Sequence, residues 1–106
     1  MELLFVNSCP RGDASRTLHL ARAFLEEFKA CRPDVKIAEH NLAQMHLKPI
    51  DMDALALREP LCDARAWEHP FLQAAVEFQR ADAVVFAAPY WDLSFPSMLK
   101  VWVENI

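Results

Sequence analysis

The sequence predicts an α/β fold built on a parallel sheet. Three strand-like stretches, at 2–6, 35–42 and 83–88, alternate along the chain with three segments whose apolar residues recur at helical spacing, at 15–30, at 70–80 and from Pro96. Parallel strands need crossover connections of about a dozen residues or more, and these are usually helices. The length of 106 residues suits a single domain over 1–106, in which helices wrap the sheet on both sides.

The first strand and the first helix follow from adjoining patterns. Residues 2–6, ELLFV, form a continuous apolar run that ends at turn-forming residues, as a strand buried on both faces does. From Ser15 to about Ala30 the apolar residues recur at helical spacing, and RPD at 32–34 ends that pattern. We therefore expect an amphipathic helix directly after the first strand.

The segment from 35 to 69 carries weaker signals. VKIAEHNL at 35–42 alternates in polarity, which predicts a strand near a sheet edge. Residues 43–69 contain Pro49 and Pro60 and little sustained periodicity. We expect them to form a long connection with one short helix at about 51–58.

The last three elements are a helix, a strand and a helix. The helix is expected over 70–80, where a proline suits the first turn and the apolar residues form one stripe. ADAVVFAAP at 81–89 contains the strongest buried-strand pattern, over 83–88, and Pro89 stops it. Another periodic apolar segment begins at Pro96, and it predicts the final helix.

Composition and charge argue against several classes of protein. The net charge of −4, with no basic block, argues against nucleic acid as a partner. The apolar runs are too short to span a membrane and no signal peptide is visible, so we expect a cytoplasmic location. Three cysteines and four histidines lie far apart without a CxxC or HxxxH pair, which predicts reduced thiols and no structural zinc site.

The stretch NSCPRGDASRT at 7–17 joins the first strand to the first helix. The opening N–H groups of a helix have no partner inside the helix, and its positive end favours an anion. Hydroxyl and guanidinium groups add further donors, so the loop is suited to a phosphate. These donors are Ser8, Arg11, Ser15, Arg16 and Thr17.

Other interpretations of this loop have to be weighed. Ser15 or Asp13 can act simply as the helix cap, because both residue types are preferred there. The single glycine, Gly12, cannot supply the glycine patterns of Rossmann or P-loop nucleotide sites. Cys9 invites comparison with low-molecular-weight tyrosine phosphatases, but six residues separate it from Arg16 where that family has five. We therefore interpret Cys9 as an ordinary loop residue.

The loop after the third strand, PYWDLSFP at 89–96, contains aromatic residues where core packing does not require them. Tyr90 and Trp91 can line a planar heterocycle, and backbone groups along 90–93 can bond its edge. The alternative is that Trp91 and Phe95 merely pack beneath the loop. Ligands of such sheets bind beyond the carboxyl ends of the strands, where both loops are expected to lie.

Taken together, SCPRGDASRTLHLARAF and AAPYWDLSFPSMLKVWVENI resemble the flavodoxin-like family of FMN-dependent NADH-azoreductases and NAD(P)H:quinone oxidoreductases. The resemblance implies a three-layer fold whose first three strands have the order 2-1-3, with FMN as the cofactor. It implies that the flavin phosphate is held at Ser8, Ser15, Arg16 and Thr17. It also implies that the flavin ring lies along Pro89, Tyr90, Trp91, Asp92 and Leu93.

The implied reaction is hydride transfer from NAD(P)H to FMN and then to a quinone or azo compound in the same pocket. The flavin supplies the chemistry, so no catalytic side chain is expected. The family members resembled here are homodimers with active sites at the interface, to which the 43–69 segment with Trp67 is a candidate contributor. The alternatives are an NAD(P)H-dependent FMN reductase and a truncated flavodoxin-like module without catalytic activity.

Two departures from the family pattern are expected to matter. Asp92 places a carboxylate near the flavin ring, where some relatives have an amide or an aromatic residue, and this charge should lower the flavin potential. The full sheet of this fold has the order 2-1-3-4-5, whereas only three strands are predicted here. We therefore expect the chain to be an N-terminal portion of the fold, with an apolar open edge at its third strand.

Overall fold

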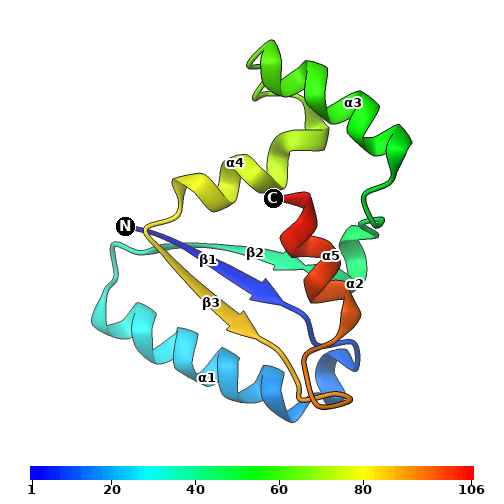
Figure 1. Cartoon of the computed structure of the whole chain (residues 1–106). Coiled ribbons are helices and arrows are strands. Elements are labelled where there is room, and N and C mark those ends of the chain that lie inside the picture. Colours follow the sequence, from blue (N-terminus) through cyan, green and yellow to red (C-terminus); the bar gives the residue numbers. More distant parts are fainter.

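The computed structural model describes residues 1–106 and contains a three-stranded parallel sheet with helices on both faces (Figure 1). The strands are β1 (Glu2–Asn7), β2 (Lys36–Asn41) and β3 (Ala83–Ala87). They are arranged in the order β2-β1-β3, and both pairings are parallel. The predicted fold class and strand order are confirmed.

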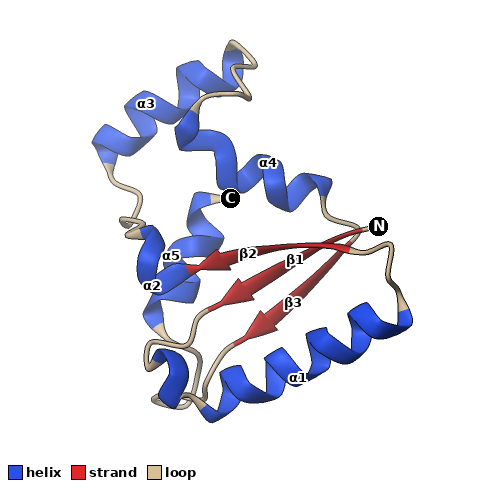
Figure 2. Ribbon diagram, turned by 180° about the vertical axis from the view of Figure 1, so that it is seen from behind, coloured by secondary structure: helices blue, strands red, loops and turns tan.

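Two layers of helices enclose the central strand. The helices are α1 (Arg16–Cys31), α2 (Leu42–Met45), α3 (Met52–Asp63), α4 (Gln73–Arg80) and α5 (Ser97–Asn105), with 3₁₀ turns at Gly12–Ala14 and Pro70–Leu72. Helix α1 covers one face of the sheet, and α2, α4 and α5 lie on the other, while α3 stands away from the sheet (Figure 2). No helix combines the length and apolar character that a membrane crossing requires.

The core consists of two clusters separated by β1. Leu3 and Phe5 point toward α1 and pack with its residues Leu18 and Leu25. Residues with the opposite orientation, Leu4 among them, pack with the second cluster around α5. Because successive side chains of a strand alternate between faces, a continuous apolar β1 fills both layers.

The long connection contains more helix than expected. Helix α3 extends from Met52 to Asp63 and continues through Pro60, which the sequence pattern suggested as a break. A proline inside a helix leaves the carbonyl group four residues earlier without a donor. That residue, Ala56, is exposed, so water can satisfy its carbonyl and the helix persists.

The third strand is less covered than its composition suggests. It ends at Ala87, and it lies at the edge of the sheet rather than between two strands. The side chain of Phe86 is 49 % exposed for this reason. The predicted open apolar edge is confirmed, whereas the expectation of a deeply buried strand is wrong in this chain.

Candidate functional site

A hollow of about 430 Å³ lies between the β1–α1 loop and the β3–α5 loop. It is at the carboxyl ends of β1 and β3, where ligands of open α/β sheets bind. Its volume falls within the roughly 300–1,000 Å³ that is typical of small-molecule sites. The residues that line it are Pro10, Arg11, Ala14, Ser15, Arg16, Thr17, Pro89 and Trp91.

Hydrogen bonds hold the two loops together behind this hollow. The carbonyl oxygen of Ala87, the last residue of β3, accepts from the Ser8 backbone N–H at 3.0 Å and from the Ser8 hydroxyl at 2.9 Å. The Cys9 thiol also donates to this oxygen, at 3.5 Å, and the Asn7 side chain accepts from the Cys9 N–H at 3.1 Å. Ser8 and Cys9 are therefore buried residues that fix the loop in place.

The first loop turns into α1 at Gly12 and Ser15. Gly12 has a φ of +56°, in the left-handed region where only glycine is free of steric cost. Its carbonyl accepts from the Ser15 N–H at 2.9 Å, and the Ser15 hydroxyl oxygen accepts from the Leu18 N–H at 3.1 Å. Ser15 is thus the N-cap of α1. The expectation that Ser15 or Asp13 caps the helix is therefore met by Ser15 and not by Asp13.

The cap leaves donors for a ligand. In the cap the Ser15 hydroxyl oxygen accepts from the Leu18 N–H, so the hydroxyl hydrogen stays free to donate to a ligand. The N–H groups of Arg16 and Thr17, in the first turn, have no partner within the helix. Arg11 and Arg16 are exposed and form no ion pair. This donor set at the positive end of a 16-residue helix suits a dianionic phosphate.

The second wall of the hollow is held by a tight turn. Trp91 and Ser94 exchange two backbone hydrogen bonds of 2.8 Å each, and the central residues Asp92 and Leu93 have φ values of +48° and +63°. Positive φ at both central positions defines a type I′ turn, which favours Asn-Gly. Leucine carries a steric cost in this conformation, and strain of this kind is concentrated at functional loops.

The structure brings some of the predicted site residues together and leaves others apart. Six residues that the sequence pointed to line the hollow: Arg11, Ser15, Arg16, Thr17, Pro89 and Trp91. Ser8 lies behind it with its hydroxyl donated to Ala87, while Tyr90, Asp92 and Leu93 are exposed beyond its lining. Pro10 and Ala14 also line the hollow. The sequence did not predict them, because neither side chain carries a polar or charged group that would indicate ligand binding.

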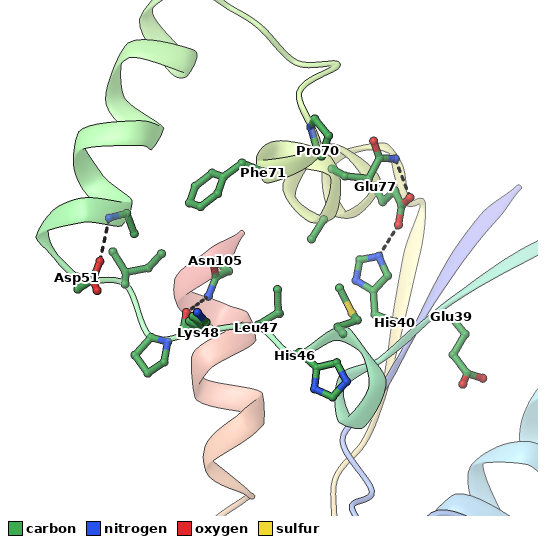
Figure 3. A pocket seen from close by; sticks show the side chains of 16 residues that line it. Glu39, His40, His46, Leu47, Lys48, Asp51, Pro70, Phe71, Glu77 and Asn105 are labelled. Carbon is green, nitrogen blue, oxygen red and sulfur yellow. Dashed lines mark hydrogen bonds and ion pairs between the residues drawn. The ribbon is translucent and has the colours of Figure 1, made fainter.

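A larger hollow of about 580 Å³ lies on the far side of α2, between α3, α4 and the loop that precedes α3 (Figure 3). Several of its polar side chains are already bonded to one another or to nearby backbone groups. His40 and Glu77 are paired, the Asn105 amide donates to the Lys48 carbonyl at 3.0 Å, and Asp51 accepts from the Ala54 N–H at 2.8 Å. We place the candidate site in the smaller hollow, where the free guanidinium groups of Arg11 and Arg16 lie beside the N-terminus of α1.

Burial and hydrogen bonding act in opposite directions on Glu77. Burial raises the pKa of this carboxyl, but hydrogen bonds from Gln73 and His40, together with the positive charge of Arg80, outweigh that effect. The net result is a pKa below the ordinary value. Glu77 is thereby held as a carboxylate that anchors α4 to β2.

Comparison with known proteins finds sequence relatives that are named as FMN-dependent NADH:quinone oxidoreductases. A relative from Clostridium acetobutylicum, named FMN-dependent NADH:quinone oxidoreductase 2, is 33 % identical over 94 % of this chain and 49 % of its own length. Another, from Gluconobacter oxydans, named FMN-dependent NADH:quinone oxidoreductase, is 32 % identical over all of this chain and 54 % of its own. The chain thus spans about half the length of these curated relatives.

A solved structure supports the same fold. The FMN-dependent NADH-azoreductase of Bacillus anthracis, solved in complex with FMN, superposes with a TM-score of 0.82 at 22 % identity, over 100 % of this chain and 55 % of its own. The model of the family described as having a flavodoxin-like fold matches residues 1–106. The predicted resemblance is confirmed, and the chain belongs to this flavodoxin-like family.

Proposed function

We propose that this chain forms part of an FMN-dependent NAD(P)H oxidoreductase that passes hydride through its flavin to a quinone or azo acceptor. The observation that carries the proposal is the hollow in which the free donors of the α1 N-terminus face Pro89 and Trp91 of the second loop. The names of the sequence relatives agree with it. Bound FMN supplies the hydride chemistry, and the protein supplies position and electrostatics.

The residues present fit such a cofactor. The proposed phosphate donors are the N–H groups of Arg16 and Thr17, the hydroxyls of Ser15 and Thr17, and the guanidinium groups of Arg11 and Arg16. Pro89 and Trp91 form the apolar wall proposed for the ring. Ser8 acts in this proposal through the loop it fastens to Ala87, because its hydroxyl hydrogen is already donated.

Further parts of the proposal concern Tyr90, Asp92, Leu93 and the oligomer. The type I′ turn presents these three residues beyond the hollow, where they are proposed to border the ring edge. We also propose a homodimer. Helix α3 buries none of its residues and Trp67 is about half exposed, which agrees with a surface that a second copy covers.

Titration of the chain with FMN and with riboflavin, followed by flavin fluorescence, tests the phosphate site. Arg16→Ala and Thr17→Val are expected to weaken FMN about tenfold or more, because each removes a donor to a dianion worth roughly 1.5–3 kcal/mol. Riboflavin, which lacks the phosphate, should be affected little. Lys29→Ala, which removes a cation from the last turn of the same helix, is the matched control.

The loss of affinity for FMN, compared with the loss for riboflavin, shows whether these side chains bind the phosphate. Equal losses of FMN and riboflavin would assign Arg16 and Thr17 a structural role. A wild-type chain that binds both flavins with the same affinity would contradict the phosphate site altogether.

A further inference from the structure

Asn7, at the carboxyl end of β1, is buried between the first loop and β2. Its amide oxygen accepts from the Cys9 N–H at 3.1 Å, and its amide nitrogen donates to a carboxylate oxygen of Glu39 at 3.4 Å. A flipped amide would turn its nitrogen toward the Cys9 N–H and its oxygen toward the carboxylate, and both bonds would be lost. Glu39 therefore selects the orientation in which Asn7 holds the loop.

Glu39 is itself held by Arg22 of α1. In the parallel register Glu39 lies beside Phe5, so its side chain points to the sheet face that α1 covers. The two terminal nitrogens of Arg22 bond the two carboxylate oxygens, one of them at 3.3 Å, and the guanidinium carbon lies 5.3 Å from the centre of the Phe5 ring. The hydrogen bond with Glu39 raises the pKa of Arg22, although burial acts against it. The carboxylate that Asn7 meets is thus fixed by a bidentate ion pair.

The Cys9 peptide begins a series of bonds that leads to the candidate site. The Cys9 carbonyl accepts from the Gly12 N–H at 3.2 Å, and the Gly12 carbonyl accepts from the Ser15 N–H at 2.9 Å. Ser15 then caps α1, whose first turn lines the hollow. Because Arg22 lies one turn further along this helix, the bonds form a closed ring through β1, β2 and α1.

We propose that Glu39 is a positioning residue of the candidate site. With Arg22 it orients the Asn7 amide, and this amide fixes the loop whose bonds end at the Ser15 cap. Glu39 does not line the hollow, so it acts on a ligand only through the loop. The hold on the loop is independent of any ligand, whereas an effect on FMN rests on the proposed function.

Amide hydrogen exchange of the chain without flavin tests the hold on the loop. Glu39→Leu removes the carboxylate and keeps a side chain of similar size. The Cys9 and Gly12 amides are expected to exchange about tenfold faster, because the loop then opens more easily. Exchange at 20–30, in the body of α1, should stay unchanged. Lys36→Leu, at the other end of the same strand, is the matched control and should leave the loop as it is.

The conservative variant Glu39→Gln is expected to restore the hold. Its amide oxygen still accepts from Asn7, so exchange at Cys9 should stay within about twofold of the wild type. Exchange as fast in Glu39→Gln as in Glu39→Leu would show that Asn7 is not held by an acceptor at this position, and would overturn the proposal.

The ion pair is tested from its other side. Arg22→Met keeps an apolar stem over Phe5 but releases Glu39, so it should accelerate exchange of the loop. Arg32→Met breaks the ion pair with Asp34 at the far end of α1 and should leave the loop unchanged. Should Glu39→Leu fail to fold, the comparison of these two arginine variants decides the proposal.

Flavin titration measures the consequence at the hollow. Glu39→Leu is expected to weaken FMN about fivefold, because a loosened loop presents the phosphate donors less well, and to affect riboflavin little. A role in overall stability alone would not change the preference for FMN over riboflavin.

The two measurements separate this proposal from the proposed function. Faster exchange at Cys9 in Glu39→Leu, in a chain whose wild type binds no FMN, would support the positioning role and contradict the flavin site. Equal exchange of the loop in Glu39→Leu and Lys36→Leu would overturn the positioning role. Equal acceleration of the loop and of 20–30 in Glu39→Leu would overturn it too, because Glu39 would then stabilise the fold as a whole.

Discussion

The indole N–H of Trp102 donates a hydrogen bond of 3.0 Å to Nδ1 of His40, inside the core. Because an indole nitrogen is only a donor, Nδ1 accepts and carries no proton. Nε2 then carries the proton and donates to Glu77, so the His40 ring links Trp102 to Glu77. This chain of bonds joins α5, β2 and α4 on one face of the sheet.

Replacement of Trp102 by Phe tests this relationship. The variant keeps an aromatic ring in the core but leaves Nδ1 of His40 buried without its donor, at a cost of about 1–3 kcal/mol. Part of the loss comes from the smaller ring. Urea unfolding of Trp102→Phe measures it, and Trp67→Phe, at a half-exposed position, should change the free energy of unfolding by under about 0.5 kcal/mol. Equal effects of the two variants would show that the bond to His40 adds no stability.

The lowered pKa of Glu77 predicts acid sensitivity. Its folded pKa lies below the ordinary 4.5, so the ionised carboxylate stabilises the fold. This contribution is fully present above 4.5 and is lost as the pH falls through the lowered folded value. We expect Glu77→Gln to unfold more easily at neutral pH and to lose less stability on acidification, measured by urea unfolding across that range. Glu26→Gln, on exposed α1 surface, should follow the wild-type curve.

The strained turn predicts a stabilising substitution. Leu93 has a φ of +63° and an exposure of 84 %, so Leu93→Gly removes a steric cost and little packing. A left-handed conformation costs a non-glycine residue about 1–2 kcal/mol. Glycine also raises the conformational entropy of the unfolded chain, which offsets part of the stabilisation. Thermal unfolding should show a net gain of up to about 1 kcal/mol. The same change at exposed Leu57, inside α3, should instead lower helix stability by about 1 kcal/mol. A loss at both positions would mean that Leu93 has packing that offsets its strain.

The carboxylate of Asp92 tests the proposed orientation of the flavin. If it borders the ring, Asp92→Asn removes a negative charge that disfavours an anionic reduced flavin, and the midpoint potential of bound FMN should rise. Spectroelectrochemical titration of the two FMN complexes measures this change. Asp53→Asn, in the first turn of α3, controls for the change in net charge. An unchanged potential in Asp92→Asn would place the carboxylate away from the ring.

Much of the architecture could be predicted because it rests on local patterns. The apolar runs of β1 and of the segment before Pro89 each specify a strand, whatever lies beside them in the fold. The helical spacing after Ser15 specifies a helix in the same way. The two loops could be singled out for a similar reason, since polar and aromatic residues follow buried strands there. The length of α3 could not be predicted from the sequence, because a proline such as Pro60 is tolerated inside a helix only where the carbonyl group that it leaves without a donor is exposed to water.

Position and bonding of individual side chains depended on contacts between distant residues. Ser8 looks like a phosphate ligand from its place in the loop, yet its hydroxyl donates to the carbonyl of Ala87, which lies 79 positions further along the chain. The pairing of His40 with Trp102 and Glu77, and the edge position of β3, likewise arise only when separate segments are packed. Periodicity reports which residues face a core, whereas hydrogen-bond partners and strand neighbours are set by how those segments meet in space.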